Sequence, residues 1–120
     1  MLVYQPNTAT PDAEFMDLGA PEAMGGKVLE GTPNIAARID FNHDGMLAGI
    51  FEATTGKVEV TFPFTEHATI LEGEVTITDG SGQTHTYRPG DSYFIKQGQV
   101  VIWDVPGARV RKSFFNITRT

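Results

Sequence analysis

Two ionisable residues, Glu66 and Lys112, alternate with apolar residues at every second position of their segments. Side chains along a β-strand point to opposite faces in turn, so Glu66 shares a face with Ala68, and Lys112 shares the more apolar face of its own segment with Val110 and Phe114. A buried glutamate and a buried lysine are each unfavourable alone, and removing one partner of such a pair typically costs ~3–5 kcal/mol. We therefore weigh two alternatives: the two side chains neutralise each other inside the protein, or Lys112 extends along its strand to solvent.

This arrangement would place acid–base chemistry in an apolar pocket. A carboxyl group in such a pocket has its charged form disfavoured, which suits Glu66 to act as a general acid or base. Lys112 would then orient a carboxylate or polarise a carbonyl group of a small substrate. The side chains that we expect to bind a ligand beside these two catalytic candidates are Phe64, Tyr93, Val101, Trp103 and Phe114. Plain core packing of the aromatic residues remains the alternative.

Short strands separated by turns must position these residues. The alternation of Ala37, Ile39 and Phe41 with polar neighbours indicates a strand, and similar runs follow. The predicted strands span 35–42, 46–54, 57–62, 84–88, 92–96, 100–105 and 110–118, and residues 68–78 are predicted to form a strand pair around Glu72-Gly73-Glu74. Among the turns that separate them are Thr55-Gly56 and Pro106-Gly107-Ala108. Strands recurring about every 8 to 12 residues are typical of an antiparallel sandwich or barrel.

The length and the first third of the chain indicate one domain with an arm. A chain of 120 residues suits a single domain. Residues 1–34 contain several prolines and glycines, which would break long regular elements, yet they are too apolar for a disordered tail. We expect this arm to pack on a barrel formed by residues 35–120 or on a partner subunit. A homodimer is therefore expected.

Charge and composition limit the partners and the location. The net charge of −6 argues against binding nucleic acid, which requires clustered basic residues. No apolar run approaches the ~20 residues that span a bilayer, and the sequence contains no cysteine. We expect a soluble, cytoplasmic protein with no membrane partner. Basic residues gather near the C-terminus and predict either a local anion site or a solvated strand face: Arg109, Arg111, Lys112 and Arg119.

Two segments resemble the conserved motifs of the cupin superfamily, namely Ile70–Val75 and Tyr87–Gly98. More narrowly, the chain is similar to small single-domain cupins grouped with ureidoglycine aminohydrolase and the ethanolamine-utilisation cupin. The resemblance covers residues 29–117, and the order of its glycines is more specific than any single one. It implies an all-β, double-stranded β-helix, the jelly-roll barrel of cupins.

The resemblance also implies a metal held by three histidines and a glutamate, and here the sequence departs from the family. Glu66 takes the glutamate position, but the histidine positions fall within Glu59–Phe62 and at Val101. A lone carboxylate cannot hold a transition metal tightly, and His67 should point away from Glu66. We expect no tightly bound metal and no cofactor, with the Lys112 ammonium taking over the electrostatic role of the ion. The other histidines lie beside turns, where we expect them at the surface: His43 and His85.

Three functions remain open from the sequence. The first is a small-molecule-binding cupin of unassigned activity, with its pocket at Glu66, Trp103 and Lys112. The second is an enzyme that uses Glu66 on a small polar metabolite containing nitrogen or a carboxylate. The aminohydrolase reaction is not carried over, because in that relative it depends on a metal site. The third is a non-catalytic structural or regulatory cupin whose pocket is plugged by side chains.

Overall fold

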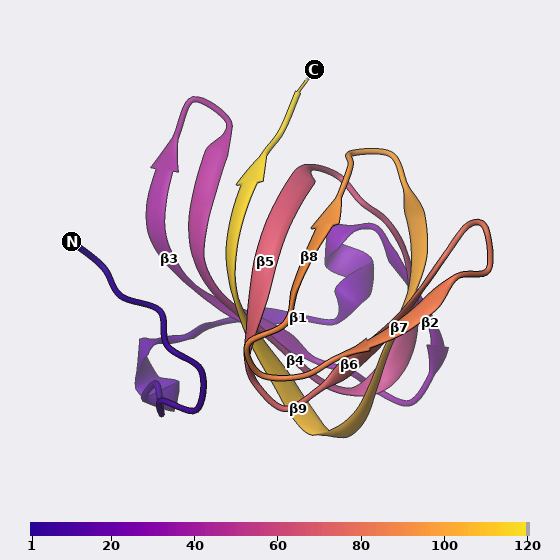
Figure 1. Ribbon diagram of the computed structural model, residues 1–120, viewed down its shortest axis with the longest axis horizontal. Coiled ribbons are helices and arrows are strands. Elements are labelled where there is room, and N and C mark those ends of the chain that lie inside the picture. The colour runs from indigo at the N-terminus through magenta and orange to yellow at the C-terminus, as the bar shows by residue number, and fades with distance from the viewer. Residues whose placement is uncertain (120) are drawn as a thin grey trace.

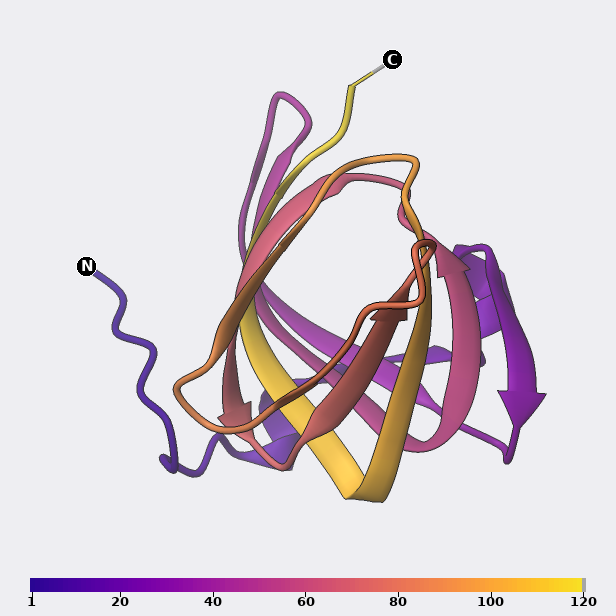
Figure 2. The same ribbon diagram turned by 45° about the vertical axis from the view of Figure 1, so that its right-hand side comes forward.

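The computed structural model describes residues 1–119, which form nine β-strands and two short 3₁₀-helices. All the strand pairs are antiparallel, and the strands wrap around a shared interior (Figures 1 and 2). The elements are η1 (Asp12–Glu14), β1 (Met16–Gly19), η2 (Pro21–Met24), β2 (Gly26–Glu30), β3 (Ile35–His43), β4 (Met46–Thr61), β5 (Thr65–Glu72), β6 (Val75–Asp79), β7 (Thr84–Tyr87), β8 (Ser92–Ile95) and β9 (Val100–Ile117). No helix within these residues is long and apolar enough to cross a membrane. The predicted all-β fold is confirmed.

The two longest strands, β4 and β9, form the spine of the sheet. Its main path runs β1-β3-β4-β9-β5-β8, with β2 added to β4, β6 to β9, and β7 to β6. The pairing of β4 with β9 extends from Met46 opposite Ile117 to Thr61 opposite Val100. The ladder between these two strands shifts register between Thr54 and Gly56, and its two parts position the site residues of β9.

Two predicted turns are bends within strands. Thr55-Gly56 and Pro106-Gly107-Ala108 do not separate strands, because β4 and β9 continue through them. Thr54 pairs with Arg109 before the bend, and Gly56 pairs with Val105 after it. The two breaks in the sequence pattern lie opposite each other, so both strands bend together and remain paired. Figure 2 shows the sharp bend of β9 in yellow.

The glycine of the first motif is required by a close approach of two backbones. Gly73 lies between β5 and β6 with a φ angle of 74°, a left-handed conformation that favours glycine. A Cβ atom at this position would lie 2.1 Å from the carbonyl oxygen of Arg109. In the second motif, an Asp91 carboxylate oxygen accepts a hydrogen bond from the Arg88 amide at 2.9 Å, which closes the turn before β8. The close approach of two backbones therefore explains the glycine of the first motif, and the turn before β8 explains the aspartate of the second.

The N-terminal segment contributes two strands that the sequence did not predict. β1 pairs with β3, and β2 pairs with β4. Both strands are too short, and too close to glycine and proline, to show a clear period of two. Before β1, the chain lies on the outer face of the barrel, where the Asn7 amide donates to the Leu71 carbonyl oxygen at 2.8 Å. Both ribbon views show these first residues, in indigo, outside the barrel strands.

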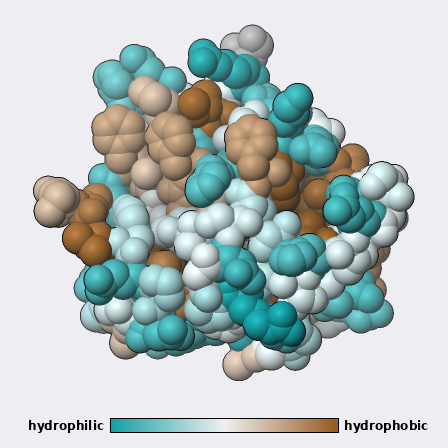
Figure 3. All heavy atoms as spheres, viewed as in Figure 1, coloured by the Kyte–Doolittle hydropathy of each residue, from teal (hydrophilic) through white to brown (hydrophobic). Residues whose placement is uncertain are grey.

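Exposed aromatic side chains form a row on the outer face of the sheet. Phe41, Phe94 and Phe115 are 46%, 61% and 42% exposed. The strand register joins them through Ala48 and His67, giving one row across β3, β4, β9, β5 and β8. Figure 3 shows apolar side chains gathered over the upper part of one face, above a more hydrophilic lower half. The predicted homodimer stays a prediction.

Candidate ligand-binding site

A cavity of about 130 Å³ lies inside the barrel. Its wall is mostly apolar, and the charged side chains in it are Glu66 and Lys112. β3, β4, β5 and β9 contribute to the wall, together with the N-terminal segment through Leu18 and Met24. Met24 is 40% exposed, whereas Glu66 is 1% exposed, so the carboxylate lies at the inner end of the cavity.

Glu66 and Lys112 form an ion pair at this inner end. The Lys112 Nζ atom lies 2.8 Å from Glu66 Oε2, and both side chains are buried. β5 and β9 are neighbours, with Glu66 opposite Asn116 and Ile70 opposite Lys112. Both ionisable side chains therefore start from the inner face of adjacent strands. The predicted pairing is present, and the alternative in which Lys112 extends to solvent is wrong.

Tyr93 completes the polar cluster. Its hydroxyl donates to Glu66 Oε2 at 2.5 Å and accepts from Lys112 Nζ at 2.5 Å. Burial raises the pKa of Tyr93 well above its usual value, and the charge and hydrogen bond of Glu66 raise it further, so the phenol is neutral. Asn116 Nδ2 makes a longer contact of 3.4 Å to Glu66 Oε1. With one carboxylate, one ammonium and one neutral phenol, the cluster carries no net charge.

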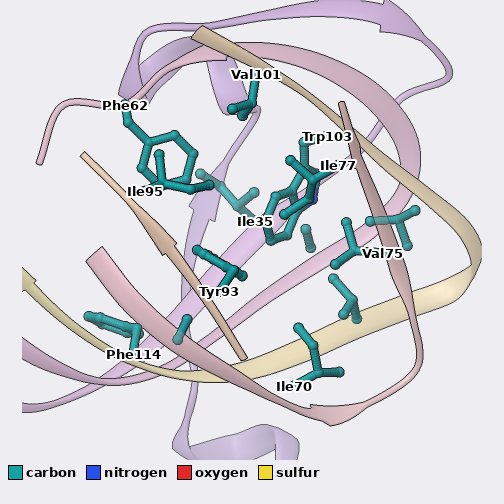
Figure 4. Close-up of a cluster of buried hydrophobic side chains, with 14 residues drawn as sticks. Ile35, Phe62, Ile70, Val75, Ile77, Tyr93, Ile95, Val101, Trp103 and Phe114 are labelled. Atoms are coloured by element: carbon teal, nitrogen blue, oxygen red, sulfur yellow. The ribbon is translucent and has the colours of Figure 1, made fainter. Parts of the chain in front are cut away.

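Aromatic rings surround the Lys112 ammonium. The Nζ atom lies 4.6 Å from the ring centroid of Trp103, 4.7 Å from Phe51, 5.3 Å from Tyr93 and 6.0 Å from Phe62. A cation over the face of an aromatic ring is attracted by the ring quadrupole, and this offsets part of the loss of hydration. In Figure 4, Phe62, Tyr93 and Trp103 point into the same interior from different parts of the chain.

Most of the residues predicted to form the site do lie together. Glu66, Lys112, Phe64, Trp103 and Phe114 line the cavity, and Tyr93 reaches the Glu66 carboxylate with its hydroxyl. Val101 does not line this cavity. It lies opposite Asp79 near the start of β9 and lines a second, more polar cavity beside Tyr87 and His85. Alternation correctly assigned Val101 to the interior, but it could not assign it to one end of the barrel.

Sequence reasoning missed several residues of the cavity. Asn116 continues the alternation of Lys112 and Phe114, so extending that pattern by one step would have found it. Phe51 lies directly opposite Lys112 in the pairing of β4 with β9, and only this register shows that the two meet. Leu18 and Met24 carry no local signal for this site.

The residues around Glu66 do not fit a metal ion of the kind that the resemblance implies. Within residues 1–119, no three His, Cys, Asp or Glu side chains come close enough to share an ion. Phe62, within the range where histidines were expected, is buried. The Lys112 ammonium lies against the one carboxylate, where it would repel a metal cation. His67 is exposed on the outer face, opposite Phe94 and Phe115.

Two basic residues of β9 face the opposite side of the sheet from Lys112. Arg111 Nε lies 2.9 Å from Glu52 Oε1, and its Nη1 donates to the Thr10 carbonyl oxygen at 2.7 Å. The Arg111 guanidinium also lies 4.3 Å from the centroid of the Phe15 ring. Arg111 is buried because the N-terminal segment covers it. For this residue, both predictions, an anion site and a solvated face, are therefore wrong.

The second of these residues, Arg109, is partly exposed and also bound to carboxylates. Its Nε atom lies 2.6 Å from Glu72 Oε2, and its Nη1 atom lies 3.2 Å from Asp12 Oδ1. Asp12 also pairs with Arg111. Protein carboxylates thus occupy the positions that a bound anion would take, and the outer face carries an ion-pair network instead of a site.

Solved structures of similar fold include proteins linked to ethanolamine utilisation. A putative ethanolamine utilization protein Q from Salmonella typhimurium LT2 is 20% identical, with a TM-score of 0.60 over 75% of this chain and 72% of that chain. The Clostridium difficile EutQ protein is 16% identical, with a TM-score of 0.66 over 92% and 81%. A protein of unknown function from Pseudomonas syringae pv. tomato is 19% identical, with a TM-score of 0.72 over 85% and 43%.

These low identities support the fold alone, and none of the curated proteins matches the chain. The family match is more specific. It spans residues 42–114, more than half of the chain, and therefore includes both motifs, the bends of β4 and β9, and every polar residue of the cluster except Asn116. The predicted cupin barrel is confirmed, while the narrower likeness to ureidoglycine aminohydrolase stays a prediction. The chain belongs to the family of EutQ-like cupin domains.

Proposed function

We propose that this cupin binds a small molecule in the barrel cavity, next to the Glu66–Lys112 pair and without a tightly bound metal. The observation that carries the proposal is the cavity itself, which stays open beside a buried polar cluster. A plugged, purely structural barrel would fill this space with side chains. An apolar cavity of about 150 Å³ holds a molecule the size of benzene, and the cavity of this protein, at about 130 Å³, is similar.

Fluorescence of Trp103, the single tryptophan of the chain, tests the proposal directly. A library of ring-sized fragments is expected to contain compounds that change its emission in a saturable manner, because the indole lines the cavity. The variant Ala53→Leu adds volume inside the cavity and should weaken binding. Ala48→Leu adds the same volume on the outer face of β4 and serves as the control. A library without one saturable ligand, or equal weakening by both variants, would contradict the proposal.

A catalytic role is the second candidate, and the hydrogen-bond chain from Lys112 through Tyr93 to Glu66 favours it. Such a chain lets a proton move between groups at the wall of a pocket, and positioned acid–base groups typically contribute about 10²–10⁴-fold in rate. The substrate would be a small polar metabolite containing nitrogen or a carboxylate. If Glu66 is the general acid or base, Glu66→Gln with the fold intact should abolish turnover of that metabolite, and Tyr93→Phe should reduce the turnover. Full turnover in Glu66→Gln would exclude it.

A further inference from the structure

We infer that the cavity selects an electrically neutral, ring-sized ligand that presents a carbonyl oxygen beside an N–H group, as a primary amide or a lactam does. The inference rests on the proposed binding function and adds the chemical class of the ligand. It follows from the charge of the polar cluster, from its unused hydrogen-bonding positions, and from the shape and lining of the cavity.

The charge of the cluster disfavours ionised ligands. Glu66 and Lys112 compensate each other at 2.8 Å, and Tyr93 is neutral. A ligand carboxylate drawn to Lys112 would also face Glu66, and a ligand ammonium drawn to Glu66 would also face Lys112. Either ion would leave water without a net counter-charge, and burying an unpaired ion is strongly unfavourable. A neutral head group avoids this penalty.

The hydrogen bonds of the cluster define what the neutral head group should offer. Within residues 1–119, Lys112 Nζ donates to two acceptors, Glu66 Oε2 and the Tyr93 hydroxyl, so one of its three N–H groups is left for the cavity. Among the same described residues, Glu66 Oε1 has only the long contact with Asn116, so it can accept another hydrogen bond. One unused donor and one unused acceptor thus lie on adjacent groups of the cavity wall. An amide complements both at once.

The remainder of the cavity favours a single apolar ring. Beyond the polar cluster, the wall is aromatic and aliphatic, including Phe51, Trp103 and Phe114. Flat rings gain from edge-to-face and offset contacts with such side chains. The volume of about 130 Å³ accommodates one six-membered ring, and a ligand made of a ring and a small head group can extend to the open end beside Met24. The head group at the inner end then leaves the ring directed towards Met24 and the solvent.

Four probes test the inference: benzamide, the ions benzoate and benzamidinium, which have nearly its shape, and toluene, which keeps the ring without a polar head group. Dissociation constants at pH 7 are measured by Trp103 fluorescence and calorimetry. We expect benzamide to bind at least about tenfold tighter than each of the other three, where tenfold corresponds to 1.4 kcal/mol. If benzoate or benzamidinium binds as tightly as benzamide, the requirement for neutrality is wrong. If toluene binds as tightly as benzamide, the inferred recognition of the amide group is wrong.

The series separates failure of the inference from failure of the proposed function. In both contrary outcomes above, the cavity binds a ligand and the proposed function stands. If none of the four probes binds, the inference is wrong, and the fragment library with Ala53→Leu and Ala48→Leu then decides the proposed function separately. The affinity measurements with the four probes require only the wild-type protein.

Two variants sharpen the test by shifting the charge of the cluster in opposite directions. Glu66→Gln removes the negative charge and should move the preference towards benzoate. Lys112→Met removes the positive charge and should move it towards benzamidinium. Ser113→Ala, next to Lys112 but on the opposite face of β9, should leave the order of affinities unchanged. If a folded Glu66→Gln or Lys112→Met variant kept the wild-type order of affinities for the four probes, the role given to charge would be wrong.

Discussion

Lys112 and Arg111 are neighbours on one strand, and both are buried cations, yet they belong to different electrostatic environments. Lys112 faces the interior and has one carboxylate, that of Glu66, together with aromatic rings. Arg111 faces outwards and belongs to a network of several carboxylates. The network also includes Arg109, whose side chain is 33% exposed, and Asp12, whose side chain is 80% exposed.

The comparison shows that the exposure and number of partners decide how much one charge matters. Inside the barrel, either member of the pair left alone would be an uncompensated charge in an apolar wall. Outside, Glu52 contacts both Arg111 and Arg109, so the loss of one cation leaves the other in place. We therefore expect mutations to have large effects on the interior pair, intermediate effects on Arg111 and local effects on the exposed carboxylate.

The largest effect is expected for Lys112→Met. This change leaves Glu66 buried without its cation and should lower the free energy of unfolding by ~3–5 kcal/mol. Urea denaturation measures the loss. The triple variant Lys112→Met/Glu66→Leu/Tyr93→Phe removes both charges together with the buried hydroxyl that bonds to them, and it should recover most of the stability, because well-packed apolar side chains can replace a buried ion pair. A single variant as stable as the wild type would show that the pair is dispensable.

A smaller loss is expected for Arg111→Met, which keeps an apolar stem under Phe15 but removes the guanidinium. Because Arg109 remains close to Glu52, we expect a loss of ~1.5–3 kcal/mol, typical of hydrogen bonds to charged groups. The same denaturation experiment compares the two variants of β9. If Arg111→Met lowered the free energy of unfolding by more than Lys112→Met does, the order expected from the comparison would be wrong.

Asp12→Asn should have a local effect on the N-terminal segment. Asp12 is exposed, but it pairs with Arg109 and Arg111 and so holds residues before β1 against the barrel. Hydrogen exchange at the Asn7 amide, which donates to Leu71, should become faster, while the thermal midpoint stays nearly constant. Asp44→Asn, at the exposed β3–β4 turn, is the matched control. Unchanged exchange at Asn7 would show that other contacts hold the segment.

The smallest expected effect is the response of the N-terminal segment to acidic pH. Hydrogen bonds from Arg111 and then Arg109 lower the pKa of Asp12 in the folded protein. Because the pKa of Asp12 is lower in the folded than in the unfolded state, its ion pairs stabilise the folded segment at all pH values above the unfolded pKa of about 3.9. This stabilisation is lost as the pH falls through the folded pKa of Asp12. The NMR shift of the Asn7 amide should therefore stay constant from pH 7 to about pH 5 and change only below about pH 4. Release of the segment near pH 6 would contradict this assignment.

Local alternation in the sequence determined which side chains face the interior. The period of two was enough to place Glu66 and Trp103 inside and His67 outside, and to start Lys112 from the inward face, while the structure decided that its ammonium stays inside. The spacing of glycine and proline was enough to predict short strands. These properties depend on neighbours along one strand, because the pleat alone sends successive side chains to opposite faces. The motifs that resemble cupins added the barrel, which the family match confirms.

Only the tertiary structure decided which interior residues meet. Phe51 reaches Lys112 through the register of β4 and β9, and Tyr93 reaches Glu66 through the register of β5 and β8. The register of β6 and β9 places Val101 at another cavity. Register, bends and the position of the N-terminal segment depend on pairing between residues far apart in the chain, and no local periodicity records that pairing.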